Sequence, residues 1–314
     1  MAEMVKKATR ESYGLALVEL GEKYPNLVVL DADLAEATKS IFFKKKYPDR
    51  FIDCGIDECN MIGVAAGLAT CGKIPFANSF AMFSAGRAFE QVRNSVGYPH
   101  LNVKIGGSHA GISVGEDGAT HQCLEDLALM RTIPGMVVLN PADHYEMQAA
   151  VRAAAVYRGP VYIRLGRLAV ESFNNNDDYR FEIGKGITLR DGGDITVIAT
   201  GLMVSRALEA VKSLEKEGVD ARLINIHTLK PIDRELIAKA ARETGRIVTV
   251  EEHNVIGGLG DAVCGVVCEE CPVPVTKIGV NDVFGHSGPA LALLDEFGLC
   301  ASHIEEVVKG VLKK

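Results

Sequence analysis

The stretch RFIDCGIDECNMIGVAAGLATCGKIPFAN, residues 50–78, decides the fold of this chain. It begins with a short apolar run at Arg50–Asp53, continues through a Gly/Ala-rich segment at Asn60–Thr70 and ends with a second apolar run at Ile74–Asn78. Short apolar runs predict buried strands, and the longer segment between them is typical of a helix. Continuous apolar strands that alternate with helices predict a mostly parallel sheet covered on both faces.

The same alternation continues along the rest of the chain. Further strands are expected at Leu27–Asp31, Asn102–Gly106, Met136–Asn140 and Val161–Leu165, and helices at Ser12–Lys23 and Ala142–Tyr157. The segment Asn174–Asp178 is polar throughout and has turn chemistry, so it marks a break between domains. After it, strands are expected at Asp194–Thr200, Ala221–Ile226, Ile247–Glu252 and Val273–Ile278. The sequence therefore predicts an α/β protein of two doubly wound domains with mostly parallel sheets, residues 1–180 and 181–314.

Composition limits the classes of function. The 314 residues are too many for a typical single domain and suit two. A formal net charge of −7 argues against a general nucleic-acid or membrane-surface binder, which would carry a basic surface. No apolar run reaches about 18 residues, and no signal peptide is expected at the N-terminus. Eight cysteines are too few for a disulfide scaffold and are typical of reduced thiols in a cytoplasmic protein.

Cys264, Cys268 and Cys271 form a C-x3-C-x2-C pattern. This spacing could hold three irons of a four-iron cluster and leave one iron open for a ligand. However, residues at i, i+4 and i+7 share one face of a helix, and a free cysteine behaves as a small hydrophobe. Helix packing is therefore favoured over an iron–sulfur site.

Gly257-Gly258-Leu259-Gly260 follows an expected strand and opens an expected helix, which is the context of a dinucleotide-binding fingerprint. The third glycine is misplaced, because Gly265 comes five residues after Gly260 where the fingerprint requires three. A tight turn without a cofactor is favoured.

A third motif has fewer structural explanations. Gly115–Gln122 places two carboxylates, a histidine and two glycines within eight residues, shortly after the strand expected at Asn102–Gly106. In a doubly wound sheet, loops at the carboxyl ends of strands bind ligands. The motif therefore predicts a polar substrate site.

At this motif the chain resembles the transketolase family of thiamine-diphosphate enzymes. The resemblance runs in order over almost the whole chain, through Phe51–Glu58, Gly63–Gly67, Ser79–Phe83, Asn140–Asp143, Gly159–Leu165, Val250–His253 and Phe284–Gly288. It covers only the second half of the family's length. The Gly-Asp-Gly motif that holds magnesium and the cofactor's diphosphate does not occur in the 314 residues. The resemblance therefore implies the pyrimidine-binding and C-terminal domains of a split transketolase, with the diphosphate-binding domain on a separate subunit.

The resemblance also implies cofactor contacts. Glu58 would hydrogen-bond the ring nitrogen of the aminopyrimidine and favour the imino tautomer that takes the proton from the thiazolium carbon. Because Glu58 begins an apolar, Gly/Ala-rich segment, we expect its carboxyl group to lie among apolar neighbours. Phe83 would stack on the aminopyrimidine, with Phe80 beside it. Weaker assignments near the cofactor are Asp33, Leu34 and Ile56.

Substrate contacts follow from the same resemblance. His121 and Asp117 would bind the hydroxyl groups of the donor ketose, since a hydroxyl both donates and accepts; Glu58 and His121 are the implied catalytic residues. The implied phosphate group consists of His109, Arg167 and Arg10, because a guanidinium suits phosphate oxygens.

Three positions differ from, or are offset against, the pattern of the family and its relatives. Ala37 stands where the family often has a phosphate-binding serine, so that Thr38 is the nearest hydroxyl, and Gly86 stands where an aromatic residue is usual. Arg87 is offset by one residue from a substrate-binding arginine of the related deoxyxylulose-phosphate synthases. These differences leave the sugar undetermined.

The implied protein is the C-terminal subunit of a transketolase of the pentose phosphate type. It would move a two-carbon ketol unit from a ketose phosphate to an aldose phosphate, with thiamine diphosphate, Mg²⁺ held by the partner subunit, and two copies of each chain. The alternatives are a fragment similar to 1-deoxyxylulose-5-phosphate synthase and the β subunit of a 2-oxoacid dehydrogenase, which lacks the Asp-Gly-x-Thr-His-Gln pattern. A non-catalytic protein that has kept the fold is a further alternative.

Overall fold

The computed structural model describes residues 5–174 and 179–313, so that part of the expected break at Asn174–Asp178 lies outside the described residues. The strands are β1 (Lys6–Ala8), β2 (Leu27–Asp31), β3 (Phe51–Asp53), β4 (Ile74–Phe80), β5 (Lys104–Ser108), β6 (Val137–Leu139), β7 (Val161–Arg164), β8 (Ala169–Glu171), β9 (Ile187–Arg190), β10 (Ile195–Ala199), β11 (Ala221–Asn225), β12 (Thr228–Lys230), β13 (Ile247–Asn254) and β14 (Val275–Val280). The principal helices are α1 (Thr9–Lys23), α2 (Ala35–Thr38), α3 (Ile41–Lys46), α4 (Glu58–Thr70), α5 (Phe89–Gln91), α6 (Asp126–Thr132), α7 (His144–Val156), α8 (Met203–Lys216), α9 (Arg234–Thr244), α10 (Leu259–Glu270), α11 (Ala290–Glu296) and α12 (Ala301–Leu312).

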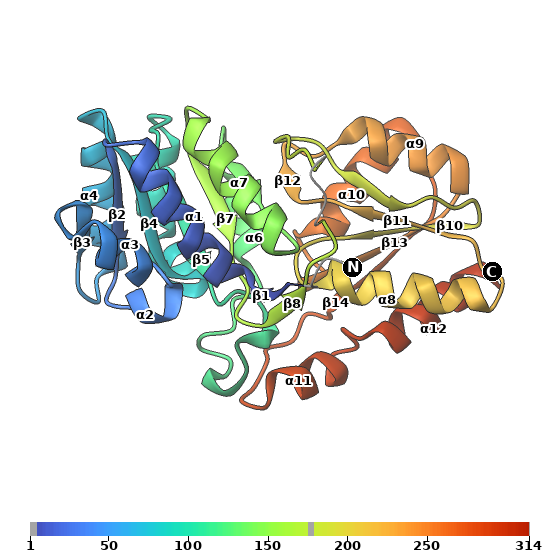
Figure 1. Ribbon diagram of the computed structural model, residues 1–314. Coiled ribbons are helices and arrows are strands. Elements are labelled where there is room, and N and C mark those ends of the chain that lie inside the picture. The colour runs from blue at the N-terminus through green and yellow to red at the C-terminus, as the bar shows by residue number, and fades with distance from the viewer. Residues whose placement is uncertain (1–4, 175–178, 314) are drawn as a thin grey trace.

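Two large sheets lie next to each other (Figure 1). The seven-stranded sheet has the order β12-β6-β7-β5-β4-β2-β3, and the five-stranded sheet has the order β14-β13-β10-β11-β9. Only β12 in the first sheet and β9 in the second run antiparallel to their neighbours. A separate two-stranded ribbon joins β1 to β8. The predicted α/β fold with mostly parallel sheets is confirmed.

Both faces of the seven-stranded sheet are covered, as the apolar strand β2 illustrates. Leu27 and Val29 pack with α1, α3 and α7, whereas Val28 and Leu30 pack with α4, α6 and the helical segment 82–97. Successive side chains of a strand point to opposite faces, so a strand buried on both sides is mostly apolar; in β2 the one polar residue is Asp31, at its end. This explains why the continuous apolar runs were sufficient to locate these strands.

The five-stranded sheet is covered by α8, α11 and α12 on one face and by α9 and α10 on the other. The cluster of buried side chains around α9 and α10 continues without a break into the cluster around α4 and α6. In addition, β12 follows β11 in the chain but pairs with β6, with Thr228 opposite Leu139. The two sheets therefore share one hydrophobic cluster, and β12, which follows β11 in the chain, belongs to the seven-stranded sheet.

Local chemistry explains where the elements begin differently from expectation. Arg50 is not in a strand: its guanidinium donates to the carbonyl oxygens of Gly21 and Tyr24 and lies over the Tyr47 ring. Helix α4 begins at Glu58, two residues early, because the Asp57 carboxylate accepts the Asn60 N–H (3.1 Å) and caps the helix. None of the helices in the described residues is long and apolar enough to cross a membrane.

Candidate active site

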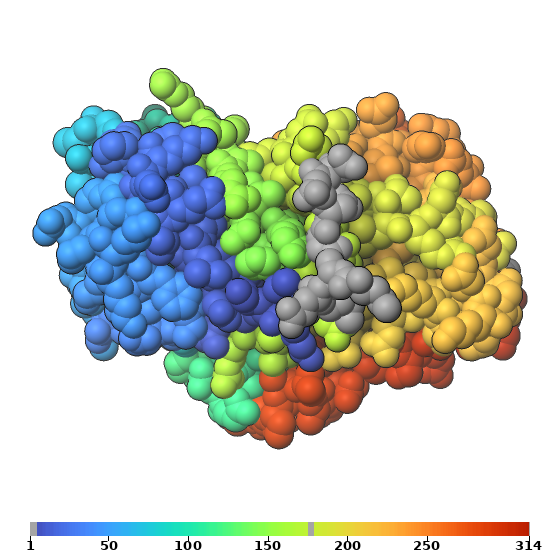
Figure 2. Space-filling view, in the orientation of Figure 1, coloured from blue at the N-terminus to red at the C-terminus, as the bar shows by residue number. Residues whose placement is uncertain are grey.

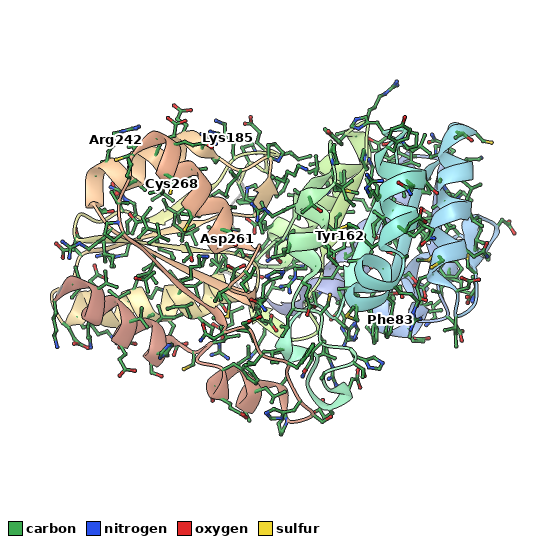
Figure 3. The ribbon with its side chains drawn as sticks, turned by 180° about the vertical axis from the view of Figure 1, so that it is seen from behind. Phe83, Tyr162, Lys185, Arg242, Asp261 and Cys268 are labelled. Atoms are coloured by element: carbon green, nitrogen blue, oxygen red, sulfur yellow. The ribbon has the colours of Figure 1, made fainter. Side chains whose placement is uncertain are left out.

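The sequence-predicted site residues gather at the carboxyl edge of the seven-stranded sheet. Asp33 and Leu34 follow β2, Ile56 and Glu58 follow β3, Phe83 follows β4 with Phe80 as its last residue, and His109 and Arg167 follow β5 and β7. Parallel neighbours end at the same edge, which is where ligands bind in such sheets. Figure 3 shows Phe83 at this edge, whereas Tyr162 lies midway along the sheet.

Glu58, the first residue of α4, is buried, with only 1% of its surface exposed. One carboxylate oxygen accepts a hydrogen bond from Ser79 Oγ at 3.1 Å, and the other accepts one from Arg87 Nη1 at 2.9 Å. The expectation of apolar neighbours was therefore wrong, because the adjacent strand and helical segment bring a hydroxyl and a guanidinium to this carboxylate. A buried carboxylate requires such partners to offset its lost hydration.

Four flat side chains form a cluster beside Glu58. The Phe80 ring stacks on His109, with centroids 4.0 Å apart, and lies nearly parallel to Phe83 at 6.0 Å. His121 meets Phe83 edge-on at 5.2 Å. The guanidinium carbon of Arg87 lies 4.6 Å from the centroid of Phe83. Arg87 therefore joins the ring of Phe83 to the carboxylate of Glu58. The spacing of four residues between Phe83 and Arg87 is the sequence signal that could have indicated this contact.

His109 is neutral at physiological pH. Burial, reinforced by the charges of Arg10 and Arg167, lowers the pKa of His109 to about 3. A guanidinium can only donate, so Nε2 of His109 accepts from Arg10 Nη1 at 3.0 Å. The proton of the neutral ring then lies on Nδ1 and is donated to Ser108 Oγ at 2.9 Å. His109 is buried, with 3% of its surface exposed, and its Nε2 orients Arg10. Arg10 also donates to the Ala37 carbonyl oxygen at 2.9 Å.

The polar loop predicted at Gly115–Gln122 follows this histidine. Glycines at positions 111, 115 and 118 have positive φ angles, so the loop reverses sharply. Arg167 donates to the Val114 carbonyl oxygen and, at 2.8 Å, to the carboxylate of Glu116. Asp117 is exposed, and His121 is half-buried with its Nδ1 2.9 Å from Thr120 Oγ1. The loop thus brings the His121 imidazole into the aromatic cluster and leaves the Asp117 carboxylate exposed.

The loop after β2 is organised by a residue that the sequence reasoning did not assign. Asp31 accepts from the Leu34 N–H at 2.7 Å, from Thr38 Oγ1 at 2.7 Å and from Ser40 Oγ at 2.8 Å. Burial raises the pKa of Asp31 to about 6. The hydroxyl of Thr38 is thus engaged by Asp31.

Asp33 and Ile56, which is 77% exposed, lie on the same edge. Within the described ranges, no hydrogen bond or ring contact links either of them to the aromatic cluster.

The two competing motifs have structural explanations. Helix α10 runs through Cys264 and Cys268, although Cys268 is exposed and does not pack as expected. No cluster of three or more metal-ligating side chains exists among residues 5–174 and 179–313. At the glycine-rich turn, the Glu251 carboxylate accepts the N–H groups of Leu259 (2.6 Å) and Gly260 (2.8 Å). This internal carboxylate takes the helix-terminal donors that a dinucleotide phosphate would need.

Comparison with known proteins agrees with this geometry. Residues 5–172 match the family model of the transketolase pyrimidine-binding domain, and residues 184–304 match that of the transketolase C-terminal domain. A Methanocaldococcus jannaschii protein named for the C-terminal section of a transketolase is 50% identical, over 99% of this chain and 98% of its own length. A 6-deoxy-6-sulfo-D-fructose transketolase subunit of Clostridium sp. is 45% identical, over 97% and 94%. A solved structure described as a split-gene transketolase in an inactive β4 tetramer superposes with a TM-score of 0.89 at 53% identity, over 98% and 99% of the two chains.

Proposed function

The chain belongs to the transketolase family, and from this premise we propose that it is the C-terminal subunit of a split transketolase. It moves a two-carbon ketol unit from a ketose phosphate to an aldose phosphate. The relatives that match it over nearly their whole length, and that are named as a section or a subunit, support this proposal over the two alternative enzyme classes. The domains proposed are residues 1–180 and 181–314.

The arrangement of Glu58, Phe83 and Arg87 is the observation that supports a pyrimidine site. A planar group with N–H donors already fits between the ring of Phe83 and the carboxylate of Glu58, because the Arg87 guanidinium lies there. An aminopyrimidine has the same character: it is flat, and its ring nitrogen in the imino form carries an N–H. The residues present therefore fit the aminopyrimidine of thiamine diphosphate.

Thiamine diphosphate, when bound, would supply the nucleophilic carbon for attack on the ketose carbonyl. Glu58 binds the ring nitrogen of the pyrimidine and stabilises the tautomer that holds a proton on that nitrogen. Phe83 and Phe80 stack against the ring and exclude water from it. Leu34 and Ile56 would contact the cofactor from the loops after β2 and β3, and Asp33 would lie near it next to Leu34.

Sugar recognition falls to the loops after β5 and β7. His121 and Asp117 bind the hydroxyl groups of the donor, and His121 also holds or moves a proton at the reacting oxygen. Arg10 and Arg167 bind the substrate phosphate, and His109 orients Arg10 by accepting its N–H. The electrostatic influence of both arginines on His109 supports a local positive potential, despite the net charge of −7.

The partner subunit supplies what this chain lacks. We propose that Mg²⁺ and the diphosphate are held by a separate chain, which the relatives named as a section or a subunit of a transketolase support. We propose two copies of each chain, working in the cytoplasm, where the eight free cysteines stay reduced. The β4 tetramer named for the solved relative is described as inactive, which supports a requirement for the second subunit.

The test is reconstitution. The purified chain is mixed with the chain of the same genome that contains Gly-Asp-Gly, together with thiamine diphosphate, Mg²⁺, xylulose 5-phosphate and ribose 5-phosphate. Ketol transfer by the mixture, but by neither chain alone, is expected. Full activity of this chain alone, or no transfer by the mixture with any of several ketose phosphates, would contradict the proposal.

A further inference from the structure

The loop that carries Asp117 and His121, residues 111–122, lies against the C-terminal domain. The N–H of Ser113 donates to the Glu252 carboxylate at 2.6 Å, and the side-chain amide of Gln122 donates to the carbonyl oxygen of His286 at 3.0 Å. Figure 2 shows the contact between this loop and the C-terminal segment at the lower edge of the molecule. Both ends of the loop are therefore fixed by residues from beyond the domain break.

Glycines make this close fit possible. A Cβ atom at Gly111 would overlap the carboxyl group of Glu252, and one at Gly118 would overlap Ser287 Oγ. A Cβ atom at Gly285, on the other side of the contact, would overlap the side-chain oxygen of Gln122. The glycines therefore let the backbone of the loop and that of the C-terminal domain approach closely, which leaves the loop little room to move.

Two adjacent carboxylates on β13 have different partners. Glu251 and Glu252 are both buried, and burial raises the pKa of each. Because successive residues of a strand point to opposite faces, Glu251 reaches the N-terminus of α10 in its own domain, whereas Glu252 reaches the loop of the other domain. The Glu252 carbonyl oxygen also accepts from Arg164 Nη2 at 2.9 Å.

Arg164 secures this joint from the first domain. Its Nε donates to Asp126 at 2.8 Å in a fully buried ion pair, and Asp126 also accepts from the Tyr162 hydroxyl at 2.8 Å. Separating Arg164 from Asp126 would leave an uncompensated buried charge, so this ion pair holds the two side chains in place. Strand β7, helix α6 and strand β13 are held together directly behind the loop.

We propose that the C-terminal domain sets the affinity for the donor sugar, and that Glu252 is a positioning residue that holds the donor-binding loop through Ser113. This inference rests on the proposed function of that loop. It gives the C-terminal domain a role in catalysis, although the residues proposed here to touch the cofactor or the substrate all belong to the first domain.

The test compares Glu252→Ala with Glu251→Ala in the complex of both subunits. We expect Glu252→Ala to raise KM for the donor ketose phosphate about tenfold or more, in keeping with the loss of a charge-assisted hydrogen bond, with a smaller change in kcat and unchanged cofactor affinity. Glu252→Gln, which keeps an acceptor oxygen, should restore most of the affinity. Glu251→Ala should lower the melting temperature without a selective change in donor KM. Equal effects of both alanine variants on donor KM would overturn the proposal.

Hydrogen exchange separates this proposal from the proposed function. In the isolated chain, amides of residues 111–122 should exchange faster in Glu252→Ala than in Glu251→Ala. Faster exchange in Glu252→Ala, together with no transketolase activity of the mixture, would contradict the proposed function but support the positioning role of Glu252. Unchanged exchange would overturn the positioning role, whatever the activity. If Glu252→Ala does not fold, Ser287→Leu, an exposed substitution that enlarges the contact at Gly118, should raise donor KM and loop exchange; no change in either would be contrary evidence.

Discussion

The carboxyl edges of the two sheets are formed by the same kind of strand, but their polar side chains differ in exposure and in the contacts that they make. At the edge of the seven-stranded sheet, Arg87 and Asp117 remain accessible beside buried groups such as Glu58. At the edge of the five-stranded sheet, polar side chains turn inward: Glu251 binds the start of α10, and Asn225 donates to Glu146 at 2.8 Å. One edge leaves polar side chains accessible and the other engages them in internal hydrogen bonds, so two sheets with the same strand pattern offer different surfaces to a ligand.

The largest effect should follow from removing the carboxylate of the open edge. Glu58→Ala should lower kcat of the reconstituted enzyme by at least about 100-fold, because the group that stabilises the reactive tautomer is lost. Turnover is measured with the partner subunit and saturating cofactor. Glu19→Gln is the control, since Glu19 forms only an exposed pair with Arg152 and should leave turnover unchanged. Near-normal turnover of Glu58→Ala would remove the distinction between the two edges.

A pH experiment sharpens the comparison at the loop after β2. The pKa of Asp31 is raised from 3.8 to about 6, so the folded protein keeps this proton up to a higher pH than the unfolded chain does. Its contribution to the free energy of unfolding is therefore greatest below about pH 4 and falls by about 3 kcal/mol as the pH rises through 6. Asp31→Asn should flatten this slope, as followed by denaturant unfolding between pH 4 and 7. Parallel curves for the two proteins would contradict it.

A third prediction concerns the donor loop at the same edge. His121→Ala should lower kcat/KM for the donor by about 100-fold, because it removes both a polar contact to the sugar and the group that holds or moves a proton at the reacting oxygen. The matched control is His303→Ala, on α12 at the far end of the C-terminal domain, which should not change kcat/KM. An equal loss in both variants would show that the loop is not the donor site.

The smallest effect is expected at Arg87, which competes with the pyrimidine for Glu58 and for the face of Phe83. Arg87→Ala should tighten binding of thiamine diphosphate by about five- to tenfold, because the half-exposed guanidinium no longer competes for the buried Glu58 carboxylate or for the Phe83 ring, a cation–π contact worth about 1 kcal/mol. Titration calorimetry of the reconstituted complex measures this affinity. Weaker binding in the variant would mean that Arg87 supports the cofactor.

The sequence was sufficient to predict much of the fold for a physical reason. Strands such as β2 and β10 are buried on both faces, so they are mostly apolar and are visible as runs. Strand β12 was missed because it has three residues and forms only by pairing with β6. A pairing partner 90 residues away leaves no local signal in the sequence.

The candidate site was predicted less evenly. The loop with Asp117 and His121 could be proposed as a substrate site because glycines and polar residues are concentrated there, and that role remains a prediction. The expectation of apolar surroundings for Glu58 was wrong because Ser79 and Arg87 come from other segments. In the sequence, Glu252 stands out only as part of the stretch Val250–His253 that resembles the family. Nothing near it along the chain indicates that it accepts a hydrogen bond from Ser113.

The pairing of β12 with β6 also affects how the two domains unfold. Because β12 pairs with β6 and one hydrophobic cluster runs through both domains, unfolding of either domain exposes apolar side chains and an unpaired strand edge in the other. A cut near residue 180 would separate two polypeptides that each lack part of their interior. We therefore expect the chain to melt in one transition and the separated halves to be less stable than the whole chain.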